Sequence, residues 1–388
     1  MKKIKILYAI ASNSGGSLKN VTDLVTHLNH ESFEITVVLS SNRQIQETQI
    51  AISKIKKMNI NIKYIDIRHT ISLFDIFSFI KIYYYLKRNS FDIIHAHSSK
   101  AGALFRIAAY FVKIPVIIYT PHCYYFTAFN GRKRYFYRSL EKFLTRFTCK
   151  TVISGTEEKM AIECNRETTK ISIIDNALDI SEYDKSSSFN EMRKNWNIPY
   201  NHLVIIGVGR LVRQKNWDMF IKAAQIVLAK NKEITFIIAG DGTCKSRLIK
   251  QIIQYGLELN IKLIGYVENI SLVYSMADIF VSTSKWEGLP YTYLEALFFN
   301  IPMIVTKTDG IEYFIKKGNC TCVPQEDPNY LANKILEQIS LLSSKLNTNT
   351  NYPFPLTNCI KEYEELYQNL FYPQKLIAKC SVATNGKC

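Results

Sequence analysis

Short apolar runs alternate along the whole chain with longer stretches in which apolar residues recur every three or four positions. The short runs are typical of buried strands, and the longer stretches are typical of helices that cover a sheet. This alternation predicts the α/β class, with parallel sheets that carry helices on both faces. The predicted strands lie at 3–9, 33–39, 60–67, 92–97, 116–119, 151–154, 171–174, 203–208, 235–239, 261–265, 279–281, 304–305 and 322–324.

Two helices predicted in the first half have unusual faces. The stretch from 73 to 86 is so apolar that we expect it to pack against the sheet; its polar stripe is Ser72, Asp75, Ser78 and Lys81. The stretch from 132 to 150 is basic and rich in aromatic residues, as a helix at a membrane surface or lipid phosphate would be. A solvated basic face is the alternative. The candidate cations are Lys100, Arg132, Lys133, Arg134, Arg138, Lys142 and Arg146, and the stripe ends at Lys150.

The composition narrows the possible partners. The formal charge is +16, from 49 basic and 33 acidic residues, and the chain of 388 residues is long enough for two domains. Nucleic acid, anionic lipid and phosphorylated substrates are all compatible with such a charge. The sequence contains no helix-turn-helix, zinc knuckle or aromatic-basic RNA motif, so we expect no nucleic-acid partner.

Apolar length and cysteine usage indicate the compartment. No apolar run approaches the roughly 20 residues of a membrane span, because Arg106, Lys113 and Pro115 interrupt the longest candidate. The N-terminus leads into a strand without the apolar region of a signal peptide, and we therefore expect a cytoplasmic protein. The nine cysteines lack paired metal-ligand spacing, so reduced thiols are expected.

The most informative stretch is a predicted strand, loop and helix in the second half. Pro290 suits the first helical position, so the amides near Gly288 and Leu289 would point out of a helix N-terminus, which attracts anions. Glu287 lies just before this helix and Glu295 about a turn and a half inside it. Amides for phosphate beside carboxylates for hydroxyl groups suit a nucleotide sugar. A solvated helix face is the alternative, because two glutamates at this spacing are common.

Two further strand-to-helix turns carry phosphate-binding signals. Gly15 and Gly16 follow the first predicted strand, where glycines let the backbone approach a ligand, although a plain turn is the alternative. Arg210 and Lys215 lie five residues apart across another turn and can both reach one diphosphate, unless they form only a solvated basic loop. Gly240 follows the next strand.

Three histidines lie at the carboxyl ends of predicted strands, where doubly wound sheets hold their ligands. His95 and His97 end one strand, and His122 follows the next one. Three imidazoles could bind a metal, but no carboxylate partner accompanies them, and we expect no metal. A neutral imidazole at His122 could hydrogen-bond a sugar hydroxyl; a buried structural histidine is the alternative.

Taken in order, these motifs resemble the retaining GT-B glycosyltransferases of family 4. The similarity extends from about residue 3 to residue 370. Within the family, the segments around the histidines are most similar to enzymes that extend bacterial polysaccharides, some of which act on undecaprenyl-diphosphate-linked sugars. The shared motifs are Gly15-Gly16, His95 to Gly102, Tyr119 to His122, Arg210 with Lys215, and Glu287 with Glu295.

The chain departs from the family pattern at several positions. Ala177 and Asn216 stand where the family has glycine. Asparagine tolerates such a position because it enters the left-handed region easily. Phe298 and Phe299 are bulky for the end of their helix, which puts the local packing in doubt, while Asn300 can still end that helix in the left-handed region.

The resemblance implies the GT-B architecture, in which two doubly wound, Rossmann-like parallel-sheet domains face each other across a cleft. It implies an acceptor-binding domain at 1–182 and a nucleotide-sugar-binding domain at 200–357, joined by a linker at 183–199. It also implies that a helix at 358–372 crosses back to the first domain. The tail at 373–388 carries no usable pattern.

The resemblance further implies a nucleotide-sugar donor, which we expect to be a UDP-sugar, and no metal or other cofactor. Arg210 and Lys215 would neutralise the leaving diphosphate, and Glu295 would hold the ribose. The implied catalytic residues are His122, Glu287, Arg210 and Lys215. The implied donor contacts are Gly15, Gly16, Arg210, Lys215, Gly240, Tyr266, Val267, Gly288, Leu289, Pro290 and Glu295.

The expected acceptor is a saccharide or a polyprenyl-diphosphate-linked saccharide in the synthesis of a bacterial surface polysaccharide, such as O-antigen, capsule or exopolysaccharide. The enzyme would then work at the inner face of the plasma membrane. The alternatives are an epimerase or phosphorylase with the same fold, or a non-catalytic two-lobed sugar-binding protein. A phosphorylase would require a pyridoxal-binding lysine, which no segment of the sequence indicates. A sugar-binding protein would ordinarily require an export signal, which we do not find here.

Overall fold

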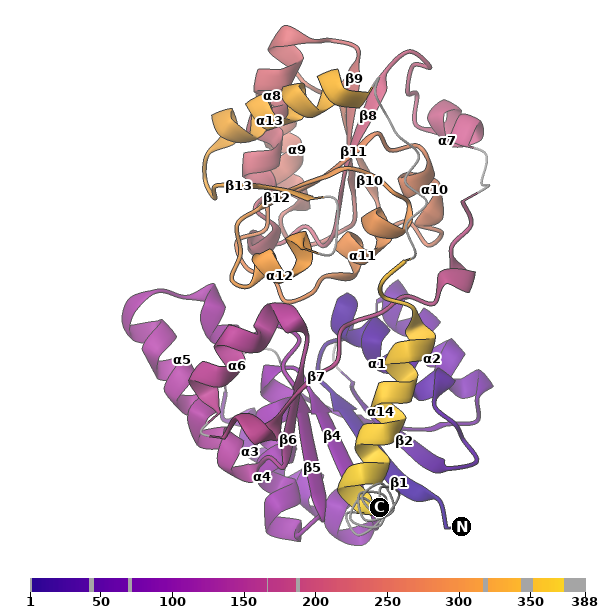
Figure 1. Ribbon diagram of the computed structural model, residues 1–388, viewed down its shortest axis with the longest axis vertical. Coiled ribbons are helices and arrows are strands. Elements are labelled where there is room, and N and C mark those ends of the chain that lie inside the picture. The colour runs from indigo at the N-terminus through magenta and orange to yellow at the C-terminus, as the bar shows by residue number, and fades with distance from the viewer. Residues whose placement is uncertain are drawn as a thin grey trace, which may run out of the picture. The chain divides into compact units, whose positions relative to one another are not determined.

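In the computed structural model, every described strand pairs in parallel with its neighbours, as the alternating pattern predicts (Figure 1). The α/β class is therefore confirmed. The structure describes residues 2–41, 45–68, 72–165, 167–185, 189–316, 320–342 and 352–372.

The chain divides into two units. The first combines Met1–Asn176 with Leu356–Cys388, and the second is Ala177–Pro355. The expected linker at 183–199 thus belongs to the second unit, because Ile198 and Trp196 pack into its core. The second unit begins earlier than residue 183, because the Leu178 amide donates to the Phe354 carbonyl (3.0 Å). The expected tail at 373–388 and linker residues 186–188 lie outside the described residues.

The first unit has a seven-stranded sheet in the order β3-β2-β1-β4-β5-β6-β7. The order reverses direction between β1 and β4, and this switch point is where sheets of this kind hold ligands. The central strands are almost entirely buried because helices cover both sheet faces. The strands are β1 (Ile4–Ile10), β2 (Phe33–Ser40), β3 (Asn61–Ile65), β4 (Ile93–His97), β5 (Val116–Thr120), β6 (Lys150–Ile153) and β7 (Ile171–Ile173).

Seven α-helices of the first unit are described, and the last of them comes from the C-terminal part of the chain. That helix, α14 (Leu356–Phe371), contacts α1 and buries Tyr363 and Tyr367. The hydroxyl groups of Tyr8 and Tyr367 lie 2.6 Å apart, so this helix is bonded to the central strand. The others are α1 (Gly16–His27), α2 (Gln46–Lys57), α3 (Phe74–Arg88), α4 (Ser99–Val112), α5 (Gly131–Leu144) and α6 (Glu158–Cys164).

Helix α3 is oriented differently from the expectation. Its buried residues are Ser78, Ile82 and Leu86, and Ser78 donates to the Asp66 carbonyl (2.5 Å). Asp75, a second member of the predicted polar stripe, forms an ion pair with Lys100. Two members of the predicted polar stripe, Ser78 and Asp75, therefore make contacts within the domain, whereas Lys81 and part of the apolar surface are exposed. The prediction that this helix packs against the sheet holds for Ile82 and Leu86, which lie in the core, but not for all of its apolar surface.

Helix α5 is shorter than the predicted stretch from 132 to 150. It ends at Leu144, a 3-10 turn follows at Thr145–Phe147, and Lys150 begins β6. The basic stripe therefore does not continue to Lys150 on one helix. The break arises because Lys150 and Thr151 pair with β5, which requires extended backbone.

A buried ion pair joins α4 to α5. The Arg106 side chain is fully buried, and its Nη1 lies 2.8 Å from Oε1 of Glu141. The Nε group donates to the Gly102 carbonyl (2.8 Å), and the guanidinium lies 3.7 Å from the centre of the Tyr119 ring. Glu141, which the sequence shows only as an acid on a basic helix, therefore neutralises a cation inside the domain.

The second unit has a six-stranded sheet in the order β10-β9-β8-β11-β12-β13, with its own switch point between β8 and β11. Its strands are β8 (Leu203–Val208), β9 (Ile234–Ala239), β10 (Ile261–Gly265), β11 (Ile279–Ser282), β12 (Met303–Thr306) and β13 (Cys320–Val323). Its helices are α7 (Phe189–Asn195), α8 (Trp217–Lys230), α9 (Lys245–Gln254), α10 (Ser271–Ser275), α11 (Tyr291–Phe298), α12 (Ile311–Ile315) and α13 (Pro328–Leu341).

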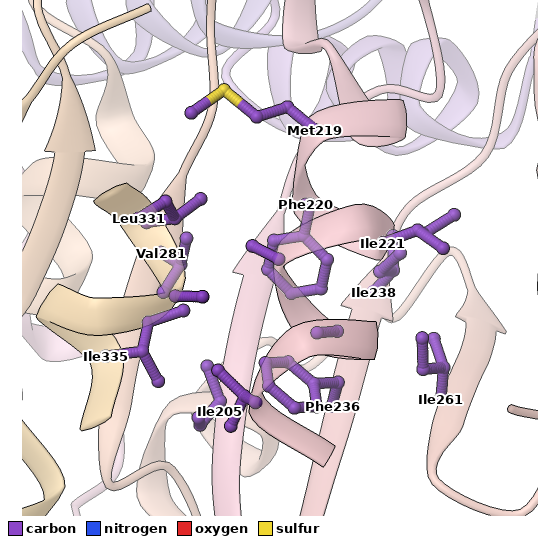
Figure 2. Close-up of a cluster of buried hydrophobic side chains, with 14 of the residues drawn as sticks. Ile205, Met219, Phe220, Ile221, Phe236, Ile238, Ile261, Val281, Leu331 and Ile335 are labelled. Atoms are coloured by element: carbon purple, nitrogen blue, oxygen red, sulfur yellow. The ribbon is translucent and has the colours of Figure 1, made fainter. Parts of the chain in front are cut away.

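The main core of the second unit lies between its sheet and helices α8, α9 and α13. Figure 2 shows Phe220 of α8 and Ile335 of α13 beside Ile205 of the central strand β8. Helix α8 can begin where it does because Asn216 adopts the left-handed conformation (φ 49°), as expected for this substitution of glycine. The position at which α8 begins fixes the backbone of the preceding turn, which carries Arg213 and Lys215.

No helix within the described ranges is both long enough and apolar enough to cross a membrane. The seven cysteines at described positions all carry free thiols.

Candidate functional site

The turns after β8 and β11, at the switch point of the second unit, are bonded to each other. The Lys285 amide donates to the Gln214 carbonyl (2.8 Å), and the Gln214 side chain donates to the Trp286 carbonyl (2.8 Å). The Thr283 hydroxyl donates to the Lys215 carbonyl (2.8 Å). These bonds hold the two turns, which are remote in sequence, as one surface.

Lys215 and Glu287 meet on this surface. Lys215 Nζ lies 2.6 Å from Glu287 Oε1, and the two side chains are only 12% and 8% exposed. The two sequence motifs thus form one mostly shielded ion pair, which spacing along the chain did not predict. A lysine ammonium has three donors, so Lys215 can hold Glu287 and still donate to a phosphate oxygen.

Arg210 lies on the same turn and is exposed. Its main-chain carbonyl accepts a hydrogen bond from Trp217 Nε1 (2.9 Å), which fixes the backbone from which the guanidinium extends. Within the described residues, no ion pair engages this guanidinium. Arg210 therefore offers a cation beside the Lys215–Glu287 pair.

Gly240, after β9, permits the close approach of two turns. Its φ is 142°, and a Cβ atom there would lie 2.1 Å from the Gly209 carbonyl oxygen. Any side chain would push the turn after β9 away from the turn after β8. Gly240 thus supports the Arg210 turn through the backbone.

Glu295 is buried, with both carboxylate oxygens hydrogen-bonded. Oε1 accepts from the Tyr183 hydroxyl (2.9 Å), and Oε2 accepts from the Tyr274 hydroxyl (2.8 Å). Beside this carboxylate, burial raises the pKa of Tyr274 well above its ordinary value. Neither tyrosine could be predicted from the sequence, because both lie in short segments without a recognisable motif. Two tyrosine hydroxyl groups thus donate to the Glu295 carboxylate.

The helix that carries Glu295 begins one residue later than expected. Pro290 is the N-cap of α11, not its first helical residue, because its extended ψ of 139° precedes the helix. At the other end, Asn300 adopts φ 55° and stops the helix as expected. Phe299 stacks on Tyr274, with ring centres 5.5 Å apart. The bulky pair of phenylalanines is accommodated because the surrounding side chains are also aromatic.

The remaining predicted donor contacts lie on neighbouring turns of the second unit. β10 ends at Gly265 with φ 75°, and the turn leaves Tyr266 exposed while Val267 packs against the core. Leu289 is buried in the same core, and Gly288 precedes it. The core contacts fix the positions of Val267 and Leu289.

The first unit brings the predicted histidines together. His97 Nδ1 lies 2.9 Å from His122 Nε2, with the two rings stacked. Burial lowers the pKa of His122 to about 3, so the ring is neutral at neutral pH. His122 has φ 54° and Cys123 has φ 97°, an uncommon pair of left-handed residues. The Cys123 amide donates to buried Glu157 (2.7 Å), which holds this turn.

His95 is fully bonded inside the domain. Its Nδ1 lies 2.7 Å from the Tyr367 hydroxyl, and its Nε2 lies 2.8 Å from the Thr120 hydroxyl. His95 is therefore a structural residue of the first unit, and its partner Tyr367 on α14 lies 272 residues away along the chain. In the part of the chain that the structure describes, no three His, Cys, Asp or Glu side chains group as metal ligands.

Gly15 and Gly16 lie at the start of α1 as predicted. Gly15 is the N-cap with φ 74°, and its amide donates to Glu47 Oε2 (2.8 Å). The Gly15 amide, which we expected to face a diphosphate, is thus hydrogen-bonded to the Glu47 carboxylate. The N-terminus of this helix accepts an anionic group, but the group seen there belongs to α2.

The predicted basic surface is partly neutralised. Lys100 pairs with Asp75 (2.7 Å) and is mostly shielded, so its charge is balanced within the domain. Arg138 pairs with Glu163 (3.4 Å), and Arg134 lies over the Phe126 ring (5.4 Å). The exposed cations of the predicted set are Arg132, Lys133, Lys142 and Arg146.

Comparison with known proteins identifies two matching family models. Residues 14–182 match the model described as Glycosyltransferase Family 4, and residues 188–351 match the model described as Glycosyl transferases group 1. The first matched segment contains strands β2 to β7, and the second contains strands β8 to β13.

Curated relatives include an Escherichia coli enzyme named UDP-Gal:alpha-D-GlcNAc-diphosphoundecaprenol alpha-1,3-galactosyltransferase. The chain is 32% identical to it over 255 residues, which cover 62% of this chain and 64% of the relative. The match therefore spans slightly less than two thirds of that relative's length. The chain is also 25% identical to the alpha-monoglucosyldiacylglycerol synthase of Acholeplasma laidlawii, over 78% of each protein.

Among solved structures, the Anabaena protein HepE in complex with UDP and glucose superimposes with a TM-score of 0.78. The superposition covers 94% of this chain and 100% of HepE at 19% identity. At 19% identity, this similarity shows the fold alone.

Proposed function

The chain belongs to the glycosyltransferases of group 1 and family 4, and from that membership we propose that it transfers a sugar from a nucleotide-sugar donor with retention of configuration. The observation that carries this proposal is the Lys215–Glu287 ion pair beside exposed Arg210 at a strand switch point. Two cations and a carboxylate within one surface suit a donor that has a diphosphate and a hydroxylated sugar.

The proposed chemistry rests on stabilising the leaving group. As the bond to the transferred sugar breaks, negative charge develops on the diphosphate, and fixed cations lower the barrier because they require no reorganisation. Arg210 and Lys215 supply these cations. Glu287 would accept hydrogen bonds from hydroxyl groups of the transferred sugar, and the neutral ring of His122 would accept or donate one hydrogen bond to a sugar hydroxyl. No metal or other cofactor enters the proposed reaction.

We propose that the donor is a UDP-sugar. Glu295 would bind the ribose by exchanging its tyrosine hydrogen bonds for ribose hydroxyl groups, and the main chain near Tyr266 and Val267 would contact the base. UDP appears in the names of both HepE complexed with UDP and glucose and the Escherichia coli galactosyltransferase, which supports this choice. The glycine turn at Gly15 would contact the diphosphate once Glu47 is displaced.

The proposed acceptor is a saccharide carried on a lipid, in the synthesis of a bacterial surface polysaccharide. The support is that one relative is named for a diphosphoundecaprenol-linked sugar and another for a diacylglycerol product. Such an acceptor would place the enzyme at the cytoplasmic surface of the membrane.

The test of the proposed function is to measure donor consumption over a panel of UDP-, GDP- and dTDP-sugars, with released nucleotide and sugar identified separately. One UDP-sugar is expected to release UDP, and a lipid-linked acceptor is expected to accelerate the release. An epimerase would instead convert the donor without releasing nucleotide. A sugar-binding protein would bind without turnover.

The two glutamates are expected to separate donor binding from turnover. Replacing Glu295 with glutamine should weaken UDP binding by about 10- to 100-fold, because an amide cannot replace a charged acceptor for hydroxyl groups. Replacing Glu287 with glutamine should leave UDP affinity nearly unchanged and reduce kcat. Calorimetry with UDP alone and steady-state kinetics measure the two effects.

The control is Tyr183→Phe, which removes one hydrogen bond to Glu295 and leaves the carboxylate in place. It should retain most of the UDP affinity. Equal losses of UDP affinity in the Glu287 and Glu295 variants would show that the roles are assigned incorrectly.

The exposed cations of α5 and of the 3-10 turn that follows it are expected to bind an anionic membrane. Each cation near such a surface contributes about 1 kcal/mol, so Arg132, Lys133, Lys142 and Arg146 together can hold the protein at low salt. Changing these four to glutamate should abolish sedimentation with phosphatidylglycerol vesicles while preserving donor hydrolysis. Undiminished sedimentation of the variant would mean that these cations are only a solvated face.

A further inference from the structure

Helix α3 has a second apolar face that no described residue covers. Its inner face packs Ile82 and Leu86 into the domain core. Besides Phe74 (50% exposed), five large apolar side chains elsewhere on this segment are exposed and define what we call the outer face of α3. They are Leu73 (80% exposed), Ile76 (57%), Phe77 (63%), Ile80 (44%) and Tyr84 (52%).

The outer face follows directly from helical geometry. Residues 73, 77, 80 and 84 are separated by four, three and four positions, so at about 3.6 residues per turn they lie along one side. Ile82 and Leu86 lie on the opposite side and are buried. A helix that is apolar on both sides is ordinarily buried on both sides. The exposed side of α3 therefore indicates an interaction surface.

The charges around this face have one sign. Lys81, Lys87 and Arg88 are exposed on the same helix. Asp75 is the one acid between residues 72 and 91, and it pairs with Lys100. The cations lie close to aromatic side chains, with Arg88 6.0 Å from the centre of the Tyr84 ring. An apolar stripe with basic neighbours and no unpaired acid is complementary to anionic lipid, which presents phosphate groups above an apolar layer.

The neighbouring helices carry the same kind of surface. Helix α4 contacts both α3 and α5. Near its C-terminus, Tyr110 and Phe111 are exposed, and Tyr110 lies 5.0 Å from Phe147, which follows α5. Exposed aromatic residues at lipid-water boundaries are typical of membrane-associated surfaces. The apolar face of α3 is thus part of a layer of helices that also includes the exposed cations of α5.

We propose that the outer face of α3 inserts into the boundary between headgroups and acyl chains of an anionic bilayer. The proposal rests on the proposed function, because a lipid-linked acceptor requires a reason for the enzyme to remain at the membrane. In this arrangement the cations of α5 attract the surface, and α3 supplies the apolar contact. Attraction by charge falls with salt, whereas burial of Phe77 and Ile80 does not.

The test variant is Phe77→Ser with Ile80→Ser, measured by sedimentation with vesicles of phosphatidylcholine alone or with phosphatidylglycerol. Loss of two buried apolar side chains is expected to weaken partitioning into anionic vesicles by about 10- to 100-fold. The matched control is Ile249→Ser with Ile253→Ser, which removes two exposed isoleucines from α9 of the second unit. The control should sediment as wild type does.

A second measurement reports insertion directly. In Phe77→Trp, the added fluorescence is expected to shift to shorter wavelength with anionic vesicles and to be quenched by lipids brominated on their acyl chains. Wild-type protein supplies the background of its own three tryptophans. No shift and no quenching, together with full sedimentation of the serine variant, would overturn the proposal.

The remaining occupant to be distinguished is a second copy of the chain. If α3 were a dimer interface, analytical ultracentrifugation without lipid would show a dimer in wild type and a monomer in the serine variant. Vesicle binding would be the same in both proteins. That result would also overturn the proposal. Donor hydrolysis by the serine variant without vesicles verifies that the fold is intact. Failure of the proposed function would instead abolish donor hydrolysis in wild type, whatever its vesicle binding.

Discussion

Arg210→Ala is expected to slow sugar transfer by about 30- to 1,000-fold, equivalent to about 2–4 kcal/mol of lost transition-state stabilisation. Arg210 extends from the turn after β8, beside a lysine that already holds a carboxylate. Without Arg210, the departing diphosphate would be stabilised by Lys215 alone, and Lys215 also binds Glu287. Because the side chain is exposed, the substitution should not disturb folding. Steady-state kinetics with the donor identified in the panel measure the effect.

Arg213→Ala is the matched control, because Arg213 is also an exposed arginine of the same turn. It should retain nearly wild-type kinetics. Lys215→Ala is a less specific variant, since it would leave buried Glu287 without its partner at 2.6 Å. Turnover of Arg210→Ala within twofold of wild type would refute the assignment of Arg210 to the diphosphate.

Glu141→Ala is expected to reduce the stability of the first unit by about 3–5 kcal/mol, because it leaves a buried guanidinium without its counter-charge. Arg106 cannot relax toward solvent, since its side chain is fully buried and stacked on Tyr119. The loss should appear as a lower thermal midpoint for the first unit. Faster amide hydrogen exchange in α4 and α5 would localise the effect.

Glu158→Ala is the control for this substitution, because Glu158 is an exposed glutamate on the nearby helix α6. Its effect should stay within about 0.5 kcal/mol. Replacing both partners, with Arg106→Met and Glu141→Leu, should recover much of the loss because no charge remains buried. A thermal midpoint of Glu141→Ala equal to that of Glu158→Ala would contradict the structural role of the pair.

The two helices of the first unit that the sequence described incorrectly have a common cause. In α3, apolar residues lie on both sides, so periodicity could not decide which side meets the sheet. In α5, Arg138 of the predicted stripe pairs with Glu163 of α6 while other cations face solvent, and Glu141 of α5 pairs with Arg106 of α4. Spacing along the chain does not reveal partners 25 or 35 residues away.

In the candidate site too, the positions of residues along the chain could be predicted from the sequence, whereas their contacts with remote residues could not. The positions of Arg210, Lys215 and Glu287 at strand-to-helix turns, and of Glu295 inside the following helix, could be predicted, because each turn follows a recognisable strand. The pairing of Lys215 with Glu287 could not be predicted, because 72 residues separate them. The tyrosine partners of Glu295 likewise come from outside its own helix.

The sequence by itself determined the alternation of strands and helices, the family and the GT-B fold class, because these depend on local hydrophobic periodicity and on motifs read in order. Only the tertiary structure decided which polar groups face one another. It assigned Glu141 to Arg106, bonded His95 to Tyr367 of the C-terminal helix, and exposed the outer face of α3. The reason is physical: periodicity records that a face is apolar, whereas burial and pairing depend on which remote segments pack against it.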